Sequence, residues 1–178
     1  MAVLITGSNG GMGSAIAQHL LETTELQVVL HIHDQRAVAD GLAAKFGARV
    51  RVVRADLCNE ADVQSMFAAL AKDDLPVDGL VNCVGISSNG MSWKLEQAEF
   101  ERIMRGNTLP TFLCTKHALL GMRARKFGRI VNISSVVGEM GAVGASHYGA
   151  AKAAVFGFTR CVAREVVKSG ITVNALAL

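Results

Sequence analysis

The chain has 178 residues, 51% of them hydrophobic, which is enough to build the continuous core of one domain. Its 18 basic and 15 acidic residues leave a formal net charge of +3 and form no basic run, so no nucleic-acid partner is expected. The apolar runs are far shorter than the roughly 20 residues that span a bilayer, so we expect no membrane insertion.

Short apolar runs alternate with stretches of helical period along the chain. In the first half, strands are predicted over residues 2–5, 27–32 and 50–54, and helices over 12–21, 37–46 and 61–70. In the second half, strands are predicted over residues 79–82, 129–133 and 172–176, and helices over about 108–123 and 146–167. Pro76 would precede a strand and Pro110 would lie in the first turn of a helix, where a missing N–H does little harm.

The predicted strands are short and apolar on both faces, which is typical of a parallel sheet covered by helices on each side. Right-handed crossovers between such strands produce a doubly wound sheet, so the predicted fold class is α/β. No linker, internal repeat or low-complexity segment interrupts the pattern. We therefore expect residues 1–178 to form a single domain.

A glycine-rich loop, Thr-Gly-Ser-Asn-Gly-Gly-Met-Gly, covers residues 6–13 between the first predicted strand and the first helix. Backbone N–H groups and the helix dipole at this place can hold a pyrophosphate, and glycine lets the chain turn sharply beside it. The spacing is GxxxGxG and differs from the commoner GxGxxG fingerprint of dinucleotide-binding proteins. The loop predicts a dinucleotide site.

Tyr148 and Lys152 are four residues apart, and so would lie one turn apart on the same face of a helix. A nearby ammonium favours the phenolate form of a tyrosine, which allows proton exchange with a substrate oxygen. Ser135 would end the fifth strand and Asn107 would stand at the start of the long helix before it. In an open α/β sheet the carboxyl ends of the strands are where ligands bind, so one crevice would collect these residues.

These motifs together resemble the short-chain dehydrogenase/reductase family, whose fold is a Rossmann-like doubly wound sheet. Residues 6–13 match its TGxxxGxG motif, residues 82–85 match its NNAG motif as Asn-Cys-Val-Gly, and Asp56 matches its acidic residue after strand three. The family's catalytic residues are matched by Asn107, Ser135, Tyr148 and Lys152. Within the family, residues 128–141 and 163–165 resemble the 3-oxoacyl-(acyl-carrier-protein) reductases.

The resemblance implies that a nicotinamide cofactor gives hydride to a carbonyl carbon while Tyr148 gives a proton to the oxygen. Ser135 would hold that oxygen, Lys152 would favour the phenolate and hold the nicotinamide ribose, and Asn107 would position a water. Ser135 is preferred to Ser134 because the family's serine lies 13 residues before the tyrosine. The residues expected to contact the cofactor are Gly7, Ser8, Asn9, Gly11, Met12, Gly13, His33, Arg36, Asp56, Leu57, Asn82, Gly85, Tyr148 and Lys152.

The preference between NADP and NAD is expected to be set just after the second strand. There His33 stands where NADP-dependent members often carry a basic residue, with Arg36 nearby, so NADP is favoured. Against this, Asn9 and Gly10 lack the basic residue of many such members, and an inward Asp34 would favour NAD.

The expected substrate is a 3-oxoacyl thioester, small or carried by an acyl-carrier protein, with sugars, steroids, diketones and secondary alcohols as alternatives. Members of the family usually continue past the position of Leu178 with a lid and a seventh strand, so the chain is expected to be short at its C-terminus. A nucleotide-binding module without catalysis is therefore an alternative function. A homodimer or homotetramer through the long helices is also expected by similarity.

The remaining signals bear on location and metal. Residues 1–6 lead directly into the glycine-rich loop and leave no room for a secretory signal, so a cytoplasmic protein is expected. The four cysteines lack zinc-ligand spacing and are interpreted as buried free thiols. His31 and His33 would share one face of a strand, but two histidines make a poor metal site, so contact with solvent or cofactor is expected instead and no metal is predicted.

Overall fold

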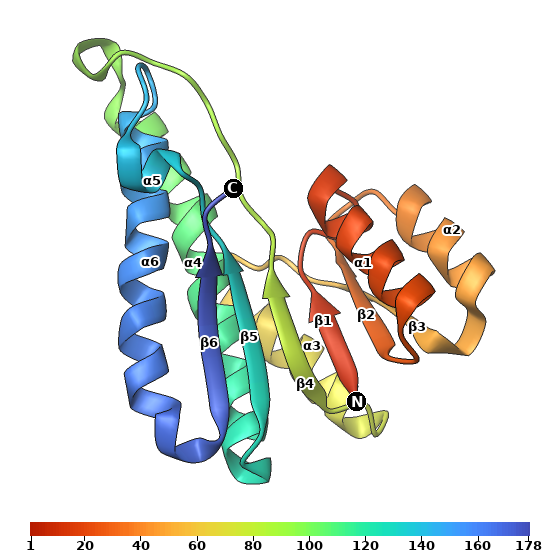
Figure 1. Cartoon of the computed structure of the whole chain (residues 1–178). Helices are drawn as coiled ribbons and strands as arrows, with labels where there is room; N and C mark the ends of the chain where they lie inside the picture. Colours follow the sequence, from red (N-terminus) through yellow and green to blue (C-terminus); the bar gives the residue numbers. More distant parts are fainter.

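The computed structural model describes all 178 residues and contains one six-stranded parallel sheet in the order β3-β2-β1-β4-β5-β6 (Figure 1). The strands are β1 (Ala2–Ile5), β2 (Gln27–Ile32), β3 (Val50–Arg54), β4 (Val77–Asn82), β5 (Gly128–Ile133) and β6 (Ile171–Leu176). The order reverses between β1 and β4, as a doubly wound sheet requires, so the predicted fold class is confirmed. The carboxyl ends of β1 and β4 therefore border the crevice where ligands bind in such sheets.

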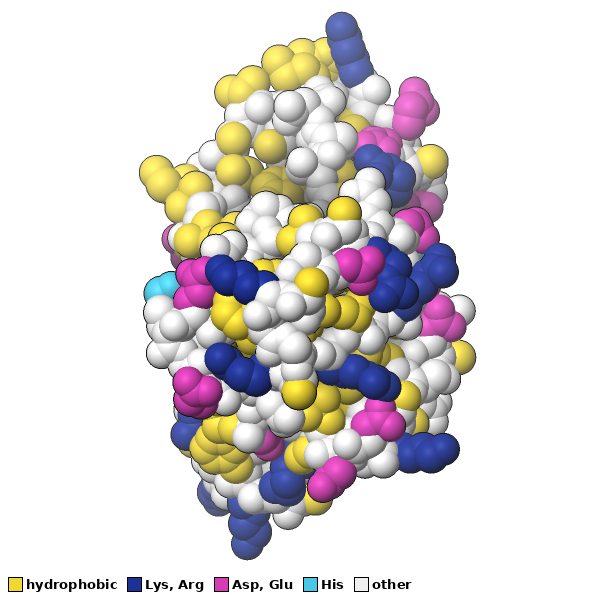
Figure 2. All heavy atoms as spheres, turned by 90° about the vertical axis from the view of Figure 1, so that its right-hand side faces the viewer, with side chains coloured by type: hydrophobic (Ala, Val, Ile, Leu, Met, Phe, Trp, Pro, Cys, Tyr) yellow, Lys and Arg dark blue, Asp and Glu magenta, His cyan; other side chains and the backbone are white.

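Six α-helices connect the strands: α1 (Gly11–Thr23), α2 (Ala37–Phe46), α3 (Glu60–Lys72), α4 (Gln97–Arg125), α5 (Val137–Met140) and α6 (Ser146–Val166). Single 3₁₀ turns occur at Gly47–Arg49, Ser92–Lys94 and Val167–Ser169. None of the helices combines the length and the hydrophobicity that a bilayer-spanning segment needs. At the end of the molecule that carries α2 and β3, basic and acidic side chains are interspersed (Figure 2).

The core has two parts, one on each face of the sheet. On one face, Leu21 of α1 and Leu42 of α2 pack with Leu30 and other apolar residues of β1 and β2. On the other face, α3, α4 and α6 pack against the sheet, with Leu113 and Val162 among the buried residues. Burial of such side chains contributes about 1.5–3 kcal/mol each.

Helices α1 and α2 cover only the β1–β3 half of their face (Figure 1). In β6 buried Ile171 and Val173 alternate with exposed Thr172 and Asn174, and Arg129 of β5 is exposed as well. The expectation that every strand is apolar on both faces was therefore wrong for the β5–β6 half. A strand with one face uncovered takes polar residues on that face.

Helix α4 begins eleven residues before the predicted start, so Asn107 and Pro110 both lie inside it. Their predicted positions at a helix start were wrong because Gly106, Asn107, Thr108 and Pro110 are weak helix formers. Packing of α4 against the sheet overrides this local preference, and buried Ile103 extends its apolar face toward the N-terminus.

Candidate active site

The glycine-rich loop turns at the carboxyl end of β1. Gly7 has a φ of +66°, and a Cβ on Gly13 would come within 2.4 Å of the Gly7 oxygen. Helix α1 then begins without a side-chain cap and without an acidic residue in its first turn. Its N-terminal N–H groups and positive dipole end are therefore free to face an anion.

His31 of β2 fixes this loop to the neighbouring strand end. Its Nδ1 accepts from the Gly7 N–H at 3.2 Å, and its Nε2 lies 3.0 Å from the carbonyl oxygen of Ala55, to which it can only donate. Burial lowers the pKa of His31, which favours this neutral form. His33 lies beyond the end of β2, so the two rings do not share a strand face, and the structure contains no metal-ligating cluster.

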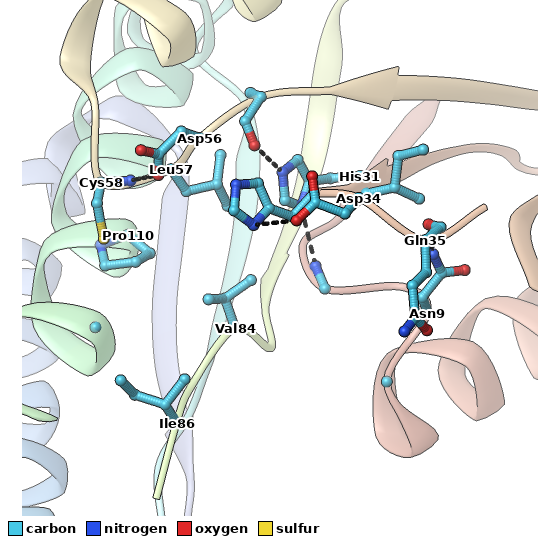
Figure 3. A pocket seen from close by; sticks show the side chains of 16 residues that line it. Asn9, His31, Asp34, Gln35, Asp56, Leu57, Cys58, Val84, Ile86 and Pro110 are labelled. Carbon is cyan, nitrogen blue, oxygen red and sulfur yellow. Dashed lines mark hydrogen bonds and ion pairs between the residues drawn. The ribbon is translucent and has the colours of Figure 1, made fainter.

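A cleft of about 570 Å³ opens beside this loop, lined from the ends of β1, β2 and β3, from the segment after β4 and from α4 (Figure 3). Five of the residues predicted to contact the cofactor line this cleft: Gly7, Asn9, His33, Asp56 and Leu57. Leu57 is nevertheless only 4% exposed. Val84 and Ile86 face the cleft from the segment after β4 (Figure 3). The cleft thus extends from the glycine-rich loop toward α4.

Other predicted cofactor residues do not line this cleft. Ser8 is fully buried, and its hydroxyl donates to the His31 carbonyl oxygen at 2.8 Å. Asn82 is also buried, and its amide donates to Thr115 at 3.2 Å and to Asn132 at 2.8 Å. Arg36 forms a hydrogen-bonded ion pair with Asp40 at 3.1 Å on the exposed start of α2.

The charged groups at the end of β2 form a connected set. Arg54, which sequence reasoning missed, donates to Asp34 at 3.1 Å and to the His33 carbonyl oxygen at 2.8 Å. His33 Nδ1 lies 3.6 Å from Asp34, so that carboxylate has two basic neighbours. Asn9 donates to the Gln35 carbonyl and accepts from Ala39 N–H, which joins the glycine-rich loop to α2.

Asn107, Lys152 and Gly85 meet at the end of β4. A Cβ on Gly85 would lie 2.7 Å from Asn107 Oδ1 and 3.2 Å from Lys152 Nζ. Lys152 is 5% exposed, its Nζ donates to the Ile133 carbonyl oxygen at 3.0 Å, and it lies 5.7 Å from the centre of the Tyr148 ring. Burial lowers the pKa of Lys152.

Two serines follow β5 at the same edge of the sheet. Ser134 Oγ donates to the Lys152 carbonyl oxygen at 2.8 Å, so it holds the backbone of α6. Ser135 Oγ donates to the Leu178 carbonyl oxygen at 3.1 Å and accepts from the Val137 N–H at 3.3 Å. The structure therefore brings both serines to the edge that carries Tyr148 and Lys152.

A buried chain of four polar side chains lies below this edge and was not predicted. Asn82 donates to Thr115 and Asn132, and Asn132 donates to Thr159 at 2.9 Å. These residues belong to β4, α4, β5 and α6, so the chain joins four elements under the site. Buried Asn and Thr inside apolar segments were the only sequence signal for it.

The cysteines are free, as expected, but only Cys114 is buried. Cys58 and Cys83 are half-buried and Cys161 is exposed, so the expectation of four buried thiols was wrong. Cys161 stands on the outer face of α6, which this chain leaves uncovered. Burial raises the pKa of Cys83, next to Lys152, to about 11.

A family model described as short chain dehydrogenase matches residues 1–178. The chain belongs to the short chain dehydrogenase family. Among curated members, it is 35% identical over 176 residues to 3-oxoacyl-(acyl-carrier-protein) reductase FabG of Aquifex aeolicus (strain VF5), covering 98% of this chain and 71% of that protein. It is 36% identical over 178 residues to acetoacetyl-CoA reductase of Allochromatium vinosum, covering 98% of this chain and 72% of the relative.

A third relative, nodulation protein G of Rhizobium sp. (strain N33), is 35% identical over 175 residues, 98% of this chain and 70% of its own length. As a short chain dehydrogenase similar to these reductases, the chain is an oxidoreductase of the 3-oxoacyl reductase type. Membership of this family implies a nicotinamide cofactor.

Proposed function

We propose that the chain reduces the carbonyl of a 3-oxoacyl thioester to an alcohol with NADPH, and that Tyr148 gives the proton. The observation that carries this proposal is the buried Lys152 ammonium, which lies 5.7 Å from the Tyr148 ring centre and beside Gly85 in the segment after β4. The names of the relatives, which include a 3-oxoacyl-(acyl-carrier-protein) reductase and an acetoacetyl-CoA reductase, support the substrate class.

The residues present fit a dinucleotide. The uncapped start of α1 suits a pyrophosphate, with main-chain donors from Gly11, Met12 and Gly13, while Gly7 and Asn9 border it. Asp56 and Leu57 line the cleft and would border the adenine end, and Gly85 leaves open space beside Lys152 that a Cβ would fill. Ser8 and Asn82 contribute by holding the loop and the strand end. When bound, the nicotinamide supplies the hydride.

The catalytic residues then divide the work. Lys152 would favour the phenolate of Tyr148 and hold the ribose of the nicotinamide, while the hydrogen bond from its Nζ to the Ile133 carbonyl oxygen fixes the direction of the side chain. Ser135 holds the substrate oxygen once its hydroxyl leaves the Leu178 carbonyl oxygen, whereas the Ser134 hydroxyl holds the Lys152 carbonyl oxygen of α6. Asn107 holds the segment after β4 through Ile86 and would position a water that resupplies the proton.

The preference for NADP rests on the charges after β2. Arg54 and His33 offset the Asp34 carboxylate, so a 2′-phosphate would meet basic groups instead of an unpaired acid. Arg36 lies on the adjoining turn and could exchange Asp40 for the phosphate. An Asp34 that binds the ribose hydroxyls of NAD is the alternative outcome of the same test.

The surface between Ser135 and Tyr148 suits an acyl chain. Met140 is 85% exposed and Val143 is 88% exposed on this stretch. Exposed apolar side chains here favour a thioester substrate, free or on an acyl-carrier protein, over a sugar.

A second surface bears on the oligomeric state. Exposed Phe112 and Leu120 on α4 support a homodimer or homotetramer through the α4 and α6 faces.

A nucleotide-binding module without turnover is the second candidate, favoured by the bond from Ser135 to the Leu178 carbonyl oxygen. Ser135 must break this hydrogen bond before its hydroxyl can donate to a substrate oxygen. The decisive measurement is NADPH oxidation with a short 3-oxoacyl thioester, using Tyr148→Phe as the control. Turnover lost in the control supports the reductase, whereas NADPH binding without turnover in the unaltered chain supports the module.

A further inference from the structure

The segment between β4 and α4, residues 83–96, is tied to the start of α6. The Gly90 N–H donates to the Gly144 carbonyl oxygen at 2.8 Å, and Ser92 Oγ donates to Ser146 Oγ at 2.9 Å. A third contact joins the same two segments: Ser88 Oγ lies 2.8 Å from Nε2 of His147, the residue before Tyr148. Figure 1 shows this segment running from β4 to the end of the molecule where α4 and α6 both begin.

Only one assignment of donors and acceptors fits the hydrogen bonds around Ser88. Glu99 of α4 accepts from Arg102 at 2.7 and 2.8 Å and from Ser88, and these bonds lower its pKa to about 2. An ionised carboxylate only accepts, so the single Ser88 proton points to Glu99. Ser88 Oγ must then accept from His147 Nε2–H, which fixes the tautomer of the ring.

His147 depends on this bond. Its side chain is completely buried, and its Nδ1 has no hydrogen-bond partner, so Ser88 is its only polar contact. The ring sits in the first turn of α6, where Ala145 provides no side-chain cap. First turns fray most readily, so contacts made there decide how well the next residue, Tyr148, is held.

We propose that His147 is a positioning residue for Tyr148: its Nε2–H, bound to Ser88, locks the first turn of α6 against the β4–α4 segment and holds the phenol beside Lys152. This inference rests on the proposed function of Tyr148. Glutamine in place of His147 puts an amide N–H near the Nε2 position and keeps the donor. Asparagine puts it near the Nδ1 position, too short to reach Ser88.

The chain offers two probes that need no turnover, because Tyr148 is its only tyrosine and Trp93 its only tryptophan. The ultraviolet absorbance of the phenolate reports the titration of Tyr148 alone, and the fluorescence anisotropy of Trp93 reports motion of the β4–α4 segment. Variants His147→Gln, His147→Asn and Ser88→Ala are compared with the unaltered chain. His19→Asn, on the exposed face of α1, is the matched control.

We expect the absorbance transition of Tyr148 to move to higher pH in His147→Asn and Ser88→Ala, because the phenol moves away from the ammonium. Trp93 anisotropy falls in both, and kcat falls about tenfold with KM for NADPH unchanged. His147→Gln and the control stay near the unaltered values. If His147→Asn does not fold, the comparison of Ser88→Ala with His147→Gln still tests the positioning role of His147.

An unchanged midpoint in folded His147→Asn or Ser88→Ala, or equal shifts in the glutamine and asparagine variants, overturns the positioning role. The proposed function fails separately, by NADPH binding without turnover in the unaltered chain. In that case the titration and anisotropy shifts still show whether His147 holds this turn.

Discussion

The side-chain amide of Asn107 pairs with both main-chain polar groups of Ile86. Asn107 Nδ2 donates to the Ile86 carbonyl oxygen at 2.8 Å, and Oδ1 accepts from the Ile86 N–H at 3.2 Å. The same Nδ2 also donates to the Ile103 carbonyl oxygen at 2.8 Å. Asn107 thus replaces a strand partner for a segment that has left the sheet.

Replacing Asn107 with alanine should lower the free energy of unfolding by about 1–3 kcal/mol, because buried main-chain groups lose their partners. Aspartate should cost more, since its carboxylate would face two carbonyl oxygens. Urea unfolding measures both, with Asn89→Ala, an exposed asparagine of the same segment, as the control. Equal stability of Asn107→Ala and the control would contradict the role of the pair.

Lys152→Met should raise the midpoint of the Tyr148 absorbance titration and remove turnover. The pKa of Lys152 is lowered by burial, so the folded protein binds its proton less well than the unfolded chain. The unaltered chain should therefore gain stability relative to Lys152→Met as the pH rises toward the unfolded lysine's pKa of about 10.4. Urea unfolding at several pH values tests this, and a constant difference between the two proteins would refute it.

The pKa of His31 is also lowered, chiefly by burial, so its contribution to stability is complete above the unfolded pKa of about 6.5 and is lost as the pH falls below it. The slope from this one group is at most about 1.4 kcal/mol for each pH unit. His31→Leu should remove that slope and loosen the Gly7 turn, weakening NADPH binding. If His31→Leu keeps the full acid sensitivity, another group causes it.

Arg54→Ala should weaken NADPH binding about tenfold and leave NADH binding nearly unchanged, because a 2′-phosphate loses a basic partner. Asp34→Asn should act in the opposite direction by releasing Arg54. Fluorescence titration with each nucleotide measures both effects, and Arg51→Ala, on the same strand and paired with Asp73, is the matched control. Equal losses for NADPH and NADH in Arg54→Ala would argue against selection of the phosphate.

The two serines after β5 should separate turnover from stability. Ser135→Ala should lower kcat by about 10²-fold through loss of a bond to the substrate oxygen. Ser134→Ala should instead cost about 1 kcal/mol of stability, since its buried hydroxyl holds the Lys152 carbonyl. Steady-state rates and urea unfolding of both variants test the assignment, which is reversed if Ser134→Ala is the inactive one.

Much of the fold could be predicted from local pattern. The bounds of β1, β2, β3 and α2 agree with the prediction, because a short apolar run or a helical period ends there at polar or glycine residues. The start of α4 could not be predicted, since its first three turns are mostly polar and exposed and are followed by Gly106 and Pro110. Only the packing of α4 in three dimensions determines where this helix begins.

The candidate site also has parts that local sequence predicts and parts that only the three-dimensional structure reveals. The glycine-rich loop and the Tyr148–Lys152 pair depend on spacing along the chain, so the sequence was sufficient to locate them. The roles of His31, Arg54 and His147 depend on contacts between residues twenty or more positions apart, and the sequence next to each residue gives no sign of its partner. Ser88 was missed for the same reason, since its partner His147 lies 59 positions further along the chain.

The buried hydrogen-bonded chain from Thr115 through Asn82 and Asn132 to Thr159 makes these four positions below the site depend on one another. Replacing one member strands its neighbour's donor or acceptor in a dry interior, while replacing all four with apolar residues of similar volume leaves nothing stranded. Anyone reshaping the substrate end of this protein would therefore have to treat these four positions as a single change.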